Sequence, residues 1–188
     1  MGVLAKLLAA SPSPWDDFWY GPAAGVSTAG LRITPATALS ISAVYACVRV
    51  LAESLAQIPL IIYRRLGNGG KERFVDHPLY RVLHDQPNRR QTSFQFREMM
   101  MGHAVLRGNA YAQILPGPRG FADQLIPLHP ERIKVELTEA GETRYRYSLP
   151  NGGVKFFPQE QIFHISTLSD DGLEGLSLIT LARESLGL

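Results

Sequence analysis

The stretch TSFQFREMMMGHAVLRGNAYAQI, residues 92–114, predicts a helix that passes directly into a strand. Thr92 and Gln95 have the spacing of a capping box, in which each side chain satisfies a backbone N–H of the first helical turn. Gly108 suits the left-handed backbone position just beyond a helix, and Asn109 then begins a run with strand periodicity. A phosphate-binding glycine loop requires the reverse order, a strand followed by a helix. We therefore interpret Gly108 and Asn109 as a structural helix-to-strand joint.

The sequence before this stretch predicts a long helix, a hairpin and a short helix. Apolar residues recur at helical spacing across residues 40–57, and Pro59 cannot continue that helix because it lacks a backbone N–H. Residues 60–65 and 71–75 are expected to pair as a hairpin, because three of the four residues just before Lys71 are glycines, which accept positive φ angles. Residues 77–84 suggest one or two further helical turns.

The sequence after this stretch changes to a period of two and contains frequent turn signals. We expect strands in six places: residues 109–115, 124–128, 132–137, 143–149, 154–157 and 162–165. Ser177 is a candidate cap for a last helix. Because helices with one hairpin precede a run of strands, the predicted fold class is α+β, with amphipathic helices packed on a turn-rich, mainly antiparallel sheet.

Composition is that of a globular domain with an arm. The chain has 188 residues, of which 45% are hydrophobic and 19% charged, and no apolar run is long enough to span a bilayer, so no membrane partner is expected. Residues 1–38 are rich in small residues and proline and are expected to form a flexible arm, while residues 39–188 form the domain. The last helix reaches Leu188 without an exit signal, so this domain is expected to be incomplete at its C-terminus. One cysteine and no clear signal peptide favour a reducing cytoplasm.

The residue types that could support catalysis or metal binding do not form a recognisable motif in this sequence. Cys47 has apolar neighbours in the middle of a predicted helix, so we expect a buried structural thiol. The five histidines lack the spacing that brings two imidazoles to one metal ion. Asp170, Asp171 and Gly172 fit a turn better than a calcium loop. We therefore predict no catalytic residue, no cofactor and no metal site, and a protein that is not an enzyme.

Charge is distributed unevenly along the chain. Residues 61–107 contain nine Lys or Arg and four Asp or Glu, whereas residues 108–188 contain seven and ten. These excesses can be ordinary solvated faces, or they can mark a surface for a polyanion or for another subunit. The candidate contact residues are Arg64, Arg65, Arg81, Arg89 and Arg90.

The order of six short motifs resembles the portal proteins of tailed bacteriophages, in the lineage named for the Hong Kong phage. The resemblance covers about residues 40–188. The motifs are SAVYACVRVLAESLAQIPLIIYRR (residues 42–65), HPLYRVLHDQPN (77–88), TSFQFREMMMGHAVLRGNAYAQI (92–114), LIPLHPERIKVE (125–136), YRY (145–147) and IFHISTLSDDGLEGLSLITLARESLGL (162–188). Leu178 departs from the proline that many relatives have after this serine, which affects only how the last helix starts.

The resemblance implies a structural subunit of a homo-oligomeric ring, a dodecamer in the virion, at the capsid vertex. Such a ring forms the passage for DNA packaging and genome ejection and the head-to-tail connection. The implied partners are the major capsid protein, double-stranded DNA in the channel, and the terminase and head-tail adaptor through parts not in this sequence. This chain would supply the outer wing, truncated before the stem and clip, located in the virion and, during assembly, in the host cytoplasm.

Two other function classes remain open from the residues themselves. The basic stretch 61–107 would suit a nucleic-acid-binding module that does not read sequence. An unrecognised hydrolase would need Cys47 as its nucleophile.

Overall fold

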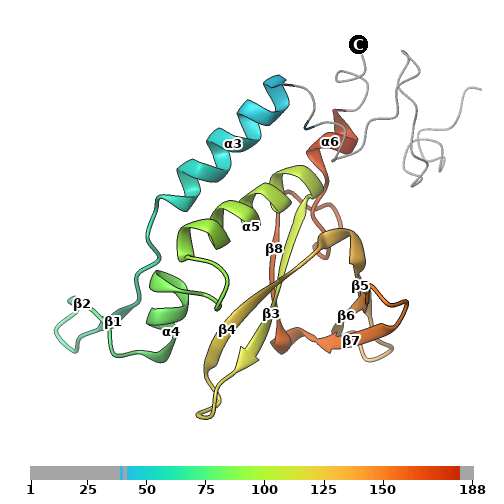
Figure 1. Cartoon of the computed structure of the whole chain (residues 1–188). Coiled ribbons are helices and arrows are strands. Elements are labelled where there is room, and N and C mark those ends of the chain that lie inside the picture. Colours follow the sequence, from blue (N-terminus) through green and yellow to red (C-terminus); the bar gives the residue numbers. More distant parts are fainter. Residues whose placement is uncertain (1–38, 40–41, 183–188) are drawn as a thin grey trace, which may run out of the picture.

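Helix α5 (Ser93–Arg107) lies at the centre of the computed structural model, which describes residue 39 and residues 42–182 (Figure 1). Both capping-box hydrogen bonds are present: the backbone N–H of Gln95 donates to the Thr92 hydroxyl, and the backbone N–H of Thr92 donates to Gln95 Oε1. The helix ends at Gly108, which has a φ of 78°, and strand β3 (Asn109–Pro116) begins at the next residue. The secondary structure predicted for this stretch is therefore confirmed.

Helix α3 (Ser42–Ala56) packs along α5 through a narrow stripe of its surface. Ala52 and Ala56 are buried, and Val44 and Val48 are partly buried against Leu106. These four positions recur every four residues and form one ridge, and the two alanines allow the helices to approach closely. The Arg97 guanidinium of α5 donates to the Ala56 carbonyl, which is free because α3 ends there.

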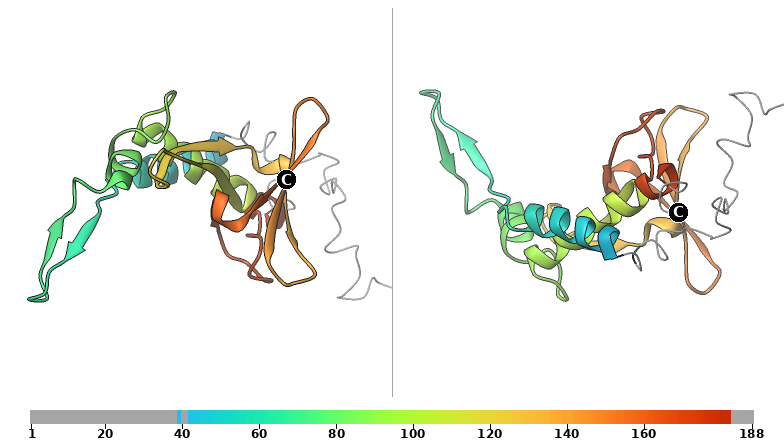
Figure 2. Two further views of the ribbon diagram at one scale, coloured as in Figure 1. Left: turned by 90° about the horizontal axis from the view of Figure 1, so that it is seen from below. Right: turned by 90° about the horizontal axis from the view of Figure 1, so that it is seen from above.

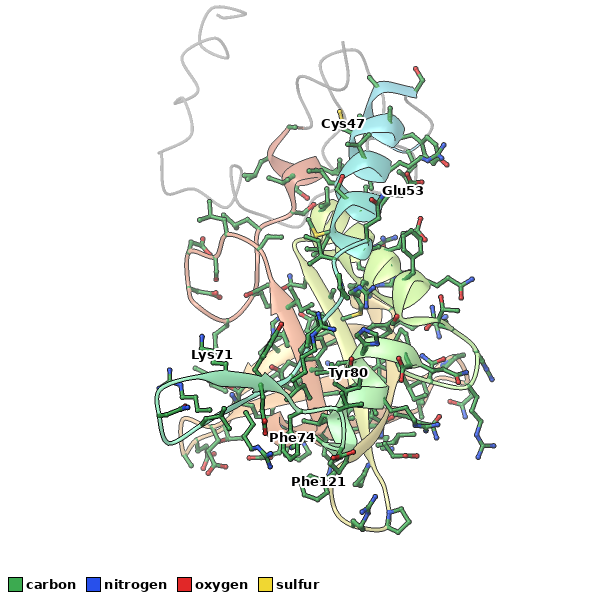
Figure 3. The ribbon with its side chains drawn as sticks, turned by 90° about the vertical axis from the view of Figure 1, so that its left-hand side faces the viewer. Cys47, Glu53, Lys71, Phe74, Tyr80 and Phe121 are labelled. Carbon is green, nitrogen blue, oxygen red and sulfur yellow. The ribbon has the colours of Figure 1, made fainter. Side chains whose placement is uncertain are left out.

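The prediction that Cys47 is buried is wrong. Its side chain is exposed on α3 (Figure 3). Helical periodicity showed that α3 has an apolar face, but α5 covers only the stripe that starts at Val44 and ends at Ala56. Apolar residues beside that stripe, Leu51 and Leu55 among them, stay exposed for the same reason.

A hairpin and a short helical segment connect α3 to α5. Strands β1 (Tyr63–Arg65) and β2 (Lys71–Arg73) pair antiparallel, as predicted, although the strands are shorter than expected. The hairpin projects from the rest of the molecule (Figure 2). Helix α4 (Pro78–Tyr80) then runs into a π-helical turn, η2 (Arg81–Asp85), and His77 caps α4 by accepting a hydrogen bond from the Leu79 N–H.

The six strands after α5 divide into two three-stranded antiparallel sheets. The order β4-β3-β8 joins β4 (Ala122–Leu128) and β8 (Ile162–Ser166) to the two edges of β3. The order β5-β6-β7 is a meander of β5 (Ile133–Leu137), β6 (Thr143–Ser148) and β7 (Val154–Pro158). Single 3-10 turns, η3 (Pro130–Arg132) and η4 (Gln159–Gln161), lead into β5 and β8. The α+β class is confirmed, and all pairings in the described residues are antiparallel.

Strand β3 is buried on both faces, because its alternate side chains enter two different hydrophobic clusters. Ala110 and Ala112 face α5 and pack with Phe96 and Met100. Tyr111 faces the opposite way and packs with residues of the meander and its neighbours, namely Leu128, Ile133, Tyr145, Phe157 and Ile162. The molecule is thus layered as α3, α5, the β4-β3-β8 sheet and the meander (Figure 1).

Helix α6 (Leu178–Leu181) begins at Ser177, whose hydroxyl accepts a hydrogen bond from the Thr180 N–H, so the predicted cap is confirmed. Ile179 of α6 packs on Leu106 of α5. Within the described residues, none of the helices has the length and apolar composition needed to cross a bilayer. The predicted arm, residues 1–38, lies outside the described residues.

Candidate subunit-contact surface

The five candidate arginines lie in separate places and not on one patch. Arg64 and Arg65 are on the projecting hairpin, Arg81 is at the start of η2, and Arg89 and Arg90 are in the turn before α5. Two of the five are already paired within the chain. Arg64 forms an ion pair with Glu72 across the hairpin and lies 4.8 Å above the Phe74 ring, and Arg81 Nη2 is 3.7 Å from Asp123 Oδ1.

Arg89 and Arg90 are exposed because a buried asparagine holds their turn in place. Asn88 is 5% exposed, and its Oδ1 accepts hydrogen bonds from the backbone N–H groups of Arg90 and Gln91. Its amide nitrogen donates to the Leu125 carbonyl on β4, at 2.9 Å. In the sequence Asn88 follows Gln86-Pro87, a pattern typical of a turn, but no local pattern marks it as buried.

Gly108 and Asn109 form a densely hydrogen-bonded joint between α5, β3 and the loop after β8. The Gly108 carbonyl accepts from the Thr167 N–H at 2.8 Å, and a Cβ on Gly108 would lie 2.2 Å from the Gly175 carbonyl oxygen. The backbone at Gly108 thus crosses the backbone at Gly175 so closely that neither position has room for a side chain. This joint ties the end of α5 to the loop after β8.

The Asn109 side chain makes the second half of this joint. Its Oδ1 accepts from the Gly175 N–H at 2.8 Å and lies 2.9 Å from His164 Nε2, while its Nδ2 donates to the Gly175 carbonyl. His164 Nδ1 is 3.3 Å from the Tyr145 hydroxyl, and burial lowers the pKa of His164. A neutral imidazole that donates from Nε2 and accepts at Nδ1 satisfies the whole chain of hydrogen bonds. These groups serve the fold, because each polar atom has a protein partner.

The loop of residues 167–176 takes its shape from Asp171. Its Oδ1 accepts hydrogen bonds from the backbone N–H groups of Leu173 and Glu174, which lower the pKa of the Asp171 carboxyl. Gly172 has a φ of 74°, so the predicted turn is observed. Among the described residues there is no group of three or more His, Cys, Asp or Glu side chains positioned for a metal ion.

A groove between the end of α3, α5 and β8 is almost wholly apolar. It encloses about 250 Å³, and its lining includes Leu55, Ile58, Met101 and Phe163. Among the described residues of the lining, Arg97 alone is charged, and it donates to the carbonyls of Ala56 and Leu83. The groove offers no arrangement of polar groups for a phosphate or for proton transfer.

Solved structures with a similar fold come from phage-like particles and from a phage portal protein. A chain in the neck of an empty GTA particle, described with C6 symmetry, is similar with a TM-score of 0.66 and 26% identity, over 76% of this chain and 38% of that chain. A chain in the virion of a native gene transfer agent (GTA) particle has a TM-score of 0.65 at 21% identity, over 81% of this chain and 41% of that chain. An HK97-family phage portal protein from Corynebacterium diphtheriae is similar in fold, with a TM-score of 0.55 and 19% identity, over 82% of this chain and 45% of that chain.

Sequence comparison names the family. Residues 42–188 match the phage portal protein family, and the chain belongs to it. The portal protein of Enterobacteria phage HK97 is 32% identical over 151 residues, 80% of this chain and 35% of that protein. A probable portal protein of Streptomyces phage phiC31 is 30% identical, over 93% of this chain and 39% of its own length. This chain therefore spans little more than a third of these two relatives.

Proposed function

We propose that this chain is the wing part of a subunit in a portal ring at the capsid vertex. In this role the ring provides the passage for DNA packaging and ejection and connects head to tail. The observation that carries the proposal is the match of one continuous domain, residues 42–188, to the portal family, together with its likeness to a chain in a particle neck. The family is structural, and we propose no catalytic role.

Under this proposal, residues 39–188 form the wing-like domain and residues 1–38 an arm that precedes it. The partners would be further copies of the subunit, the major capsid protein and double-stranded DNA in the channel. Terminase and the head-tail adaptor would bind through other parts of the portal. The virion is the proposed location, with the host cytoplasm as the place of assembly.

The described domain has the physical properties that such a ring needs. A cyclic ring uses two different patches on each subunit, which must keep a fixed relative position. Here the buried strand β3 couples α5 on one side to the meander on the other, so surfaces on opposite sides of the domain are held rigidly together. We propose that the exposed cations Arg65, Arg89 and Arg90, with the paired Arg64 and Arg81, contribute to contacts with neighbouring subunits at separate places on the domain.

The direct test is electron microscopy of the purified full-length gene product, with particle averaging. We expect closed rings with one portal subunit per repeat. A monodisperse monomer that stays monomeric at high protein concentration would contradict the proposal.

Measured DNA affinity separates this function from a nucleic-acid-binding module. Residues 61–107 would bind a 30-base-pair duplex with nanomolar affinity and a steep salt dependence if they formed a continuous basic track. Two of the five candidate arginines are paired internally, and the five are dispersed, so we expect only weak binding by the isolated subunit.

A further inference from the structure

The β1–β2 hairpin has no packing partner of its own within the described part of the chain. Its two strands pair only with each other, and none of its residues belongs to the described hydrophobic clusters. Tyr63 is 51% exposed and Leu66 at its turn is 37% exposed. A two-stranded hairpin in isolation is only marginally stable in water. This hairpin projects from the domain with exposed apolar side chains, so packing against another protein surface would stabilise it.

The charges of the hairpin indicate what that surface should carry. In the observed register Arg65 stands directly opposite Lys71, an arrangement of like charges that destabilises a strand pair. Glu72, the only acidic residue of the hairpin, already forms an ion pair with Arg64. Arg65, Lys71 and Arg73 are left without an ion pair among the described residues. An external group of carboxylates would relieve this repulsion.

The same chain carries such a group on another side of the domain. Residues 156–182 contain four carboxylates and no lysine or arginine. We define the acidic loop surface as Glu160, Asp170, Asp171 and Glu174. Gln159, beside Glu160, lines one groove with Gly172 and Leu173, so η4 and the loop after β8 are neighbours in space. Glu160 and Asp170 are exposed and form no ion pair within the described residues.

The acidic loop surface is also rigid. Asp171 holds its own loop through two backbone hydrogen bonds, and the crossing of Gly108 and Gly175 fixes where that loop leaves the domain. The hairpin and this loop lie at different ends of the molecule (Figures 1 and 2), and Lys71 lies on the hairpin away from the helices (Figure 3). In this fold the hairpin of one copy therefore does not contact its own acidic loop surface.

We propose that the β1–β2 hairpin of each subunit docks on the acidic loop surface of the next copy. The partner is a second copy of this chain, because the complementary charge is present on the chain itself. The contact is head-to-tail, and repetition around an axis closes a ring. Lys71 and Arg73 pair with Glu160 and Asp170 of the next copy, and the contact also buries the exposed side chains of Tyr63 and Leu66. This inference rests on the proposed ring function and names the surfaces that join its subunits.

The test reverses the charge of each surface separately and then of both. One variant carries Lys71→Glu and Arg73→Glu, a second carries Glu160→Lys and Asp170→Lys, and a third carries all four substitutions. Assembly of the full-length gene product is measured as the fraction of subunits in rings, by native mass spectrometry and electron microscopy. We expect each two-residue variant to lower this fraction at least tenfold, and the four-residue variant to restore most of it.

The matched control carries Arg119→Glu and Arg132→Glu, the same change of net charge as in the hairpin variant, at two exposed positions that belong to neither surface. We expect it to assemble as the unmodified chain does. Unchanged assembly in both reversed variants, an equal loss in the control, or no recovery in the four-residue variant with an unchanged melting temperature would each overturn the hairpin contact. Absence of rings from the unmodified chain would instead contradict the portal function itself.

Discussion

At the scale of single residues, two glycines decide how the last part of the domain is attached. Gly108 needs its left-handed backbone to end α5, but its lack of a side chain matters even more, because the backbone at Gly175 passes against it. The sequence signal at Gly108 was helix termination. The signal for Gly175 was absent, because close approach of two backbone segments leaves no local pattern.

Substitution Gly108→Ala should destabilise the domain more than left-handed geometry alone can explain. A left-handed conformation costs a non-glycine residue about 1–2 kcal/mol. Gly120 also has a positive φ, of 79°, but a Cβ there would meet no atom within 4 Å. We expect Gly120→Ala to lower the free energy of unfolding by about 1 kcal/mol and Gly108→Ala by about 3 kcal/mol or more. Urea unfolding measures both, and equal losses would contradict the backbone crossing.

His103 should make stability depend on pH. Burial, with the nearby cation of Arg107 and the His129 ring, lowers the pKa of His103 from 6.5 to about 4. Its ring lies against that of His129, with centroids 5.8 Å apart, and Glu131 opposes the shift only weakly. Between these pH values the unfolded chain binds a proton that the folded chain does not, so stability falls as the pH drops from about 6.5 to about 4.

The expected loss is on the order of 3 kcal/mol, and substitution of His103 should remove it. Melting temperatures of the unmodified chain and of His103→Leu would be compared at several values of pH across this range. His129→Leu, which changes an exposed histidine, is the control and should keep most of the pH dependence. A His103→Leu chain that loses stability in acid as steeply as the unmodified chain would show that another group is responsible.

At the scale of elements, α5 was predictable because its end signals are local. The capping box and the terminal glycine act within three or four residues, so they operate wherever the helix is placed.

Thr92→Ala should lower the free energy of unfolding by about 1 kcal/mol, since the N–H of Gln95 then loses its acceptor. Thr92→Ser keeps the hydroxyl and should cost much less in the same unfolding measurement. A loss just as large with serine would mean that the hydroxyl is not what stabilises the helix start.

Helix α3 shows the limit of the same reasoning. Its period of 3.6 residues predicted a helix but could not tell which part of a wide apolar face another element would cover. In the fold α5 contacts the stripe from Val44 to Ala56, and Cys47 is left in the open. Whether a residue at the edge of an apolar face is buried depends on how much of that face the neighbouring helix covers. This coverage is set by the tertiary structure.

At the scale of the whole molecule, the uneven charge counted along the sequence resolves into defined surfaces. The basic excess includes the unpaired cations of the hairpin, while the acidic excess concentrates in η4 and the loop after β8. The meander, residues 133–158, is close to neutral, because its four cations are nearly balanced by three carboxylates, one of which, Glu136, pairs with Arg144.

Ring assembly should therefore weaken as salt rises. Exposed charges are screened over about 8 Å at 0.15 M ionic strength and about 3 Å at 1 M. We expect the fraction of subunits in rings, measured by sedimentation velocity at fixed protein concentration, to fall severalfold between these conditions. The Arg119→Glu and Arg132→Glu control should show the same fall, and the four-residue reversal should show it too. Assembly that is indifferent to salt would mean that apolar contacts dominate the interface.

The sequence by itself determined the elements, the α+β class and the joint at Gly108, because caps, turn glycines and strand periodicity act over a few residues. Only the tertiary structure decided the division of the strands into two sheets, the exposure of Cys47, the burial of Asn88 and the crossing of Gly108 with Gly175. These features depend on contacts between segments far apart in the chain, such as Asn109 with Gly175, which are 66 residues apart. The candidate arginines show the same division. Their charge could be read from the sequence, but their positions and ion pairs depend on how the chain folds.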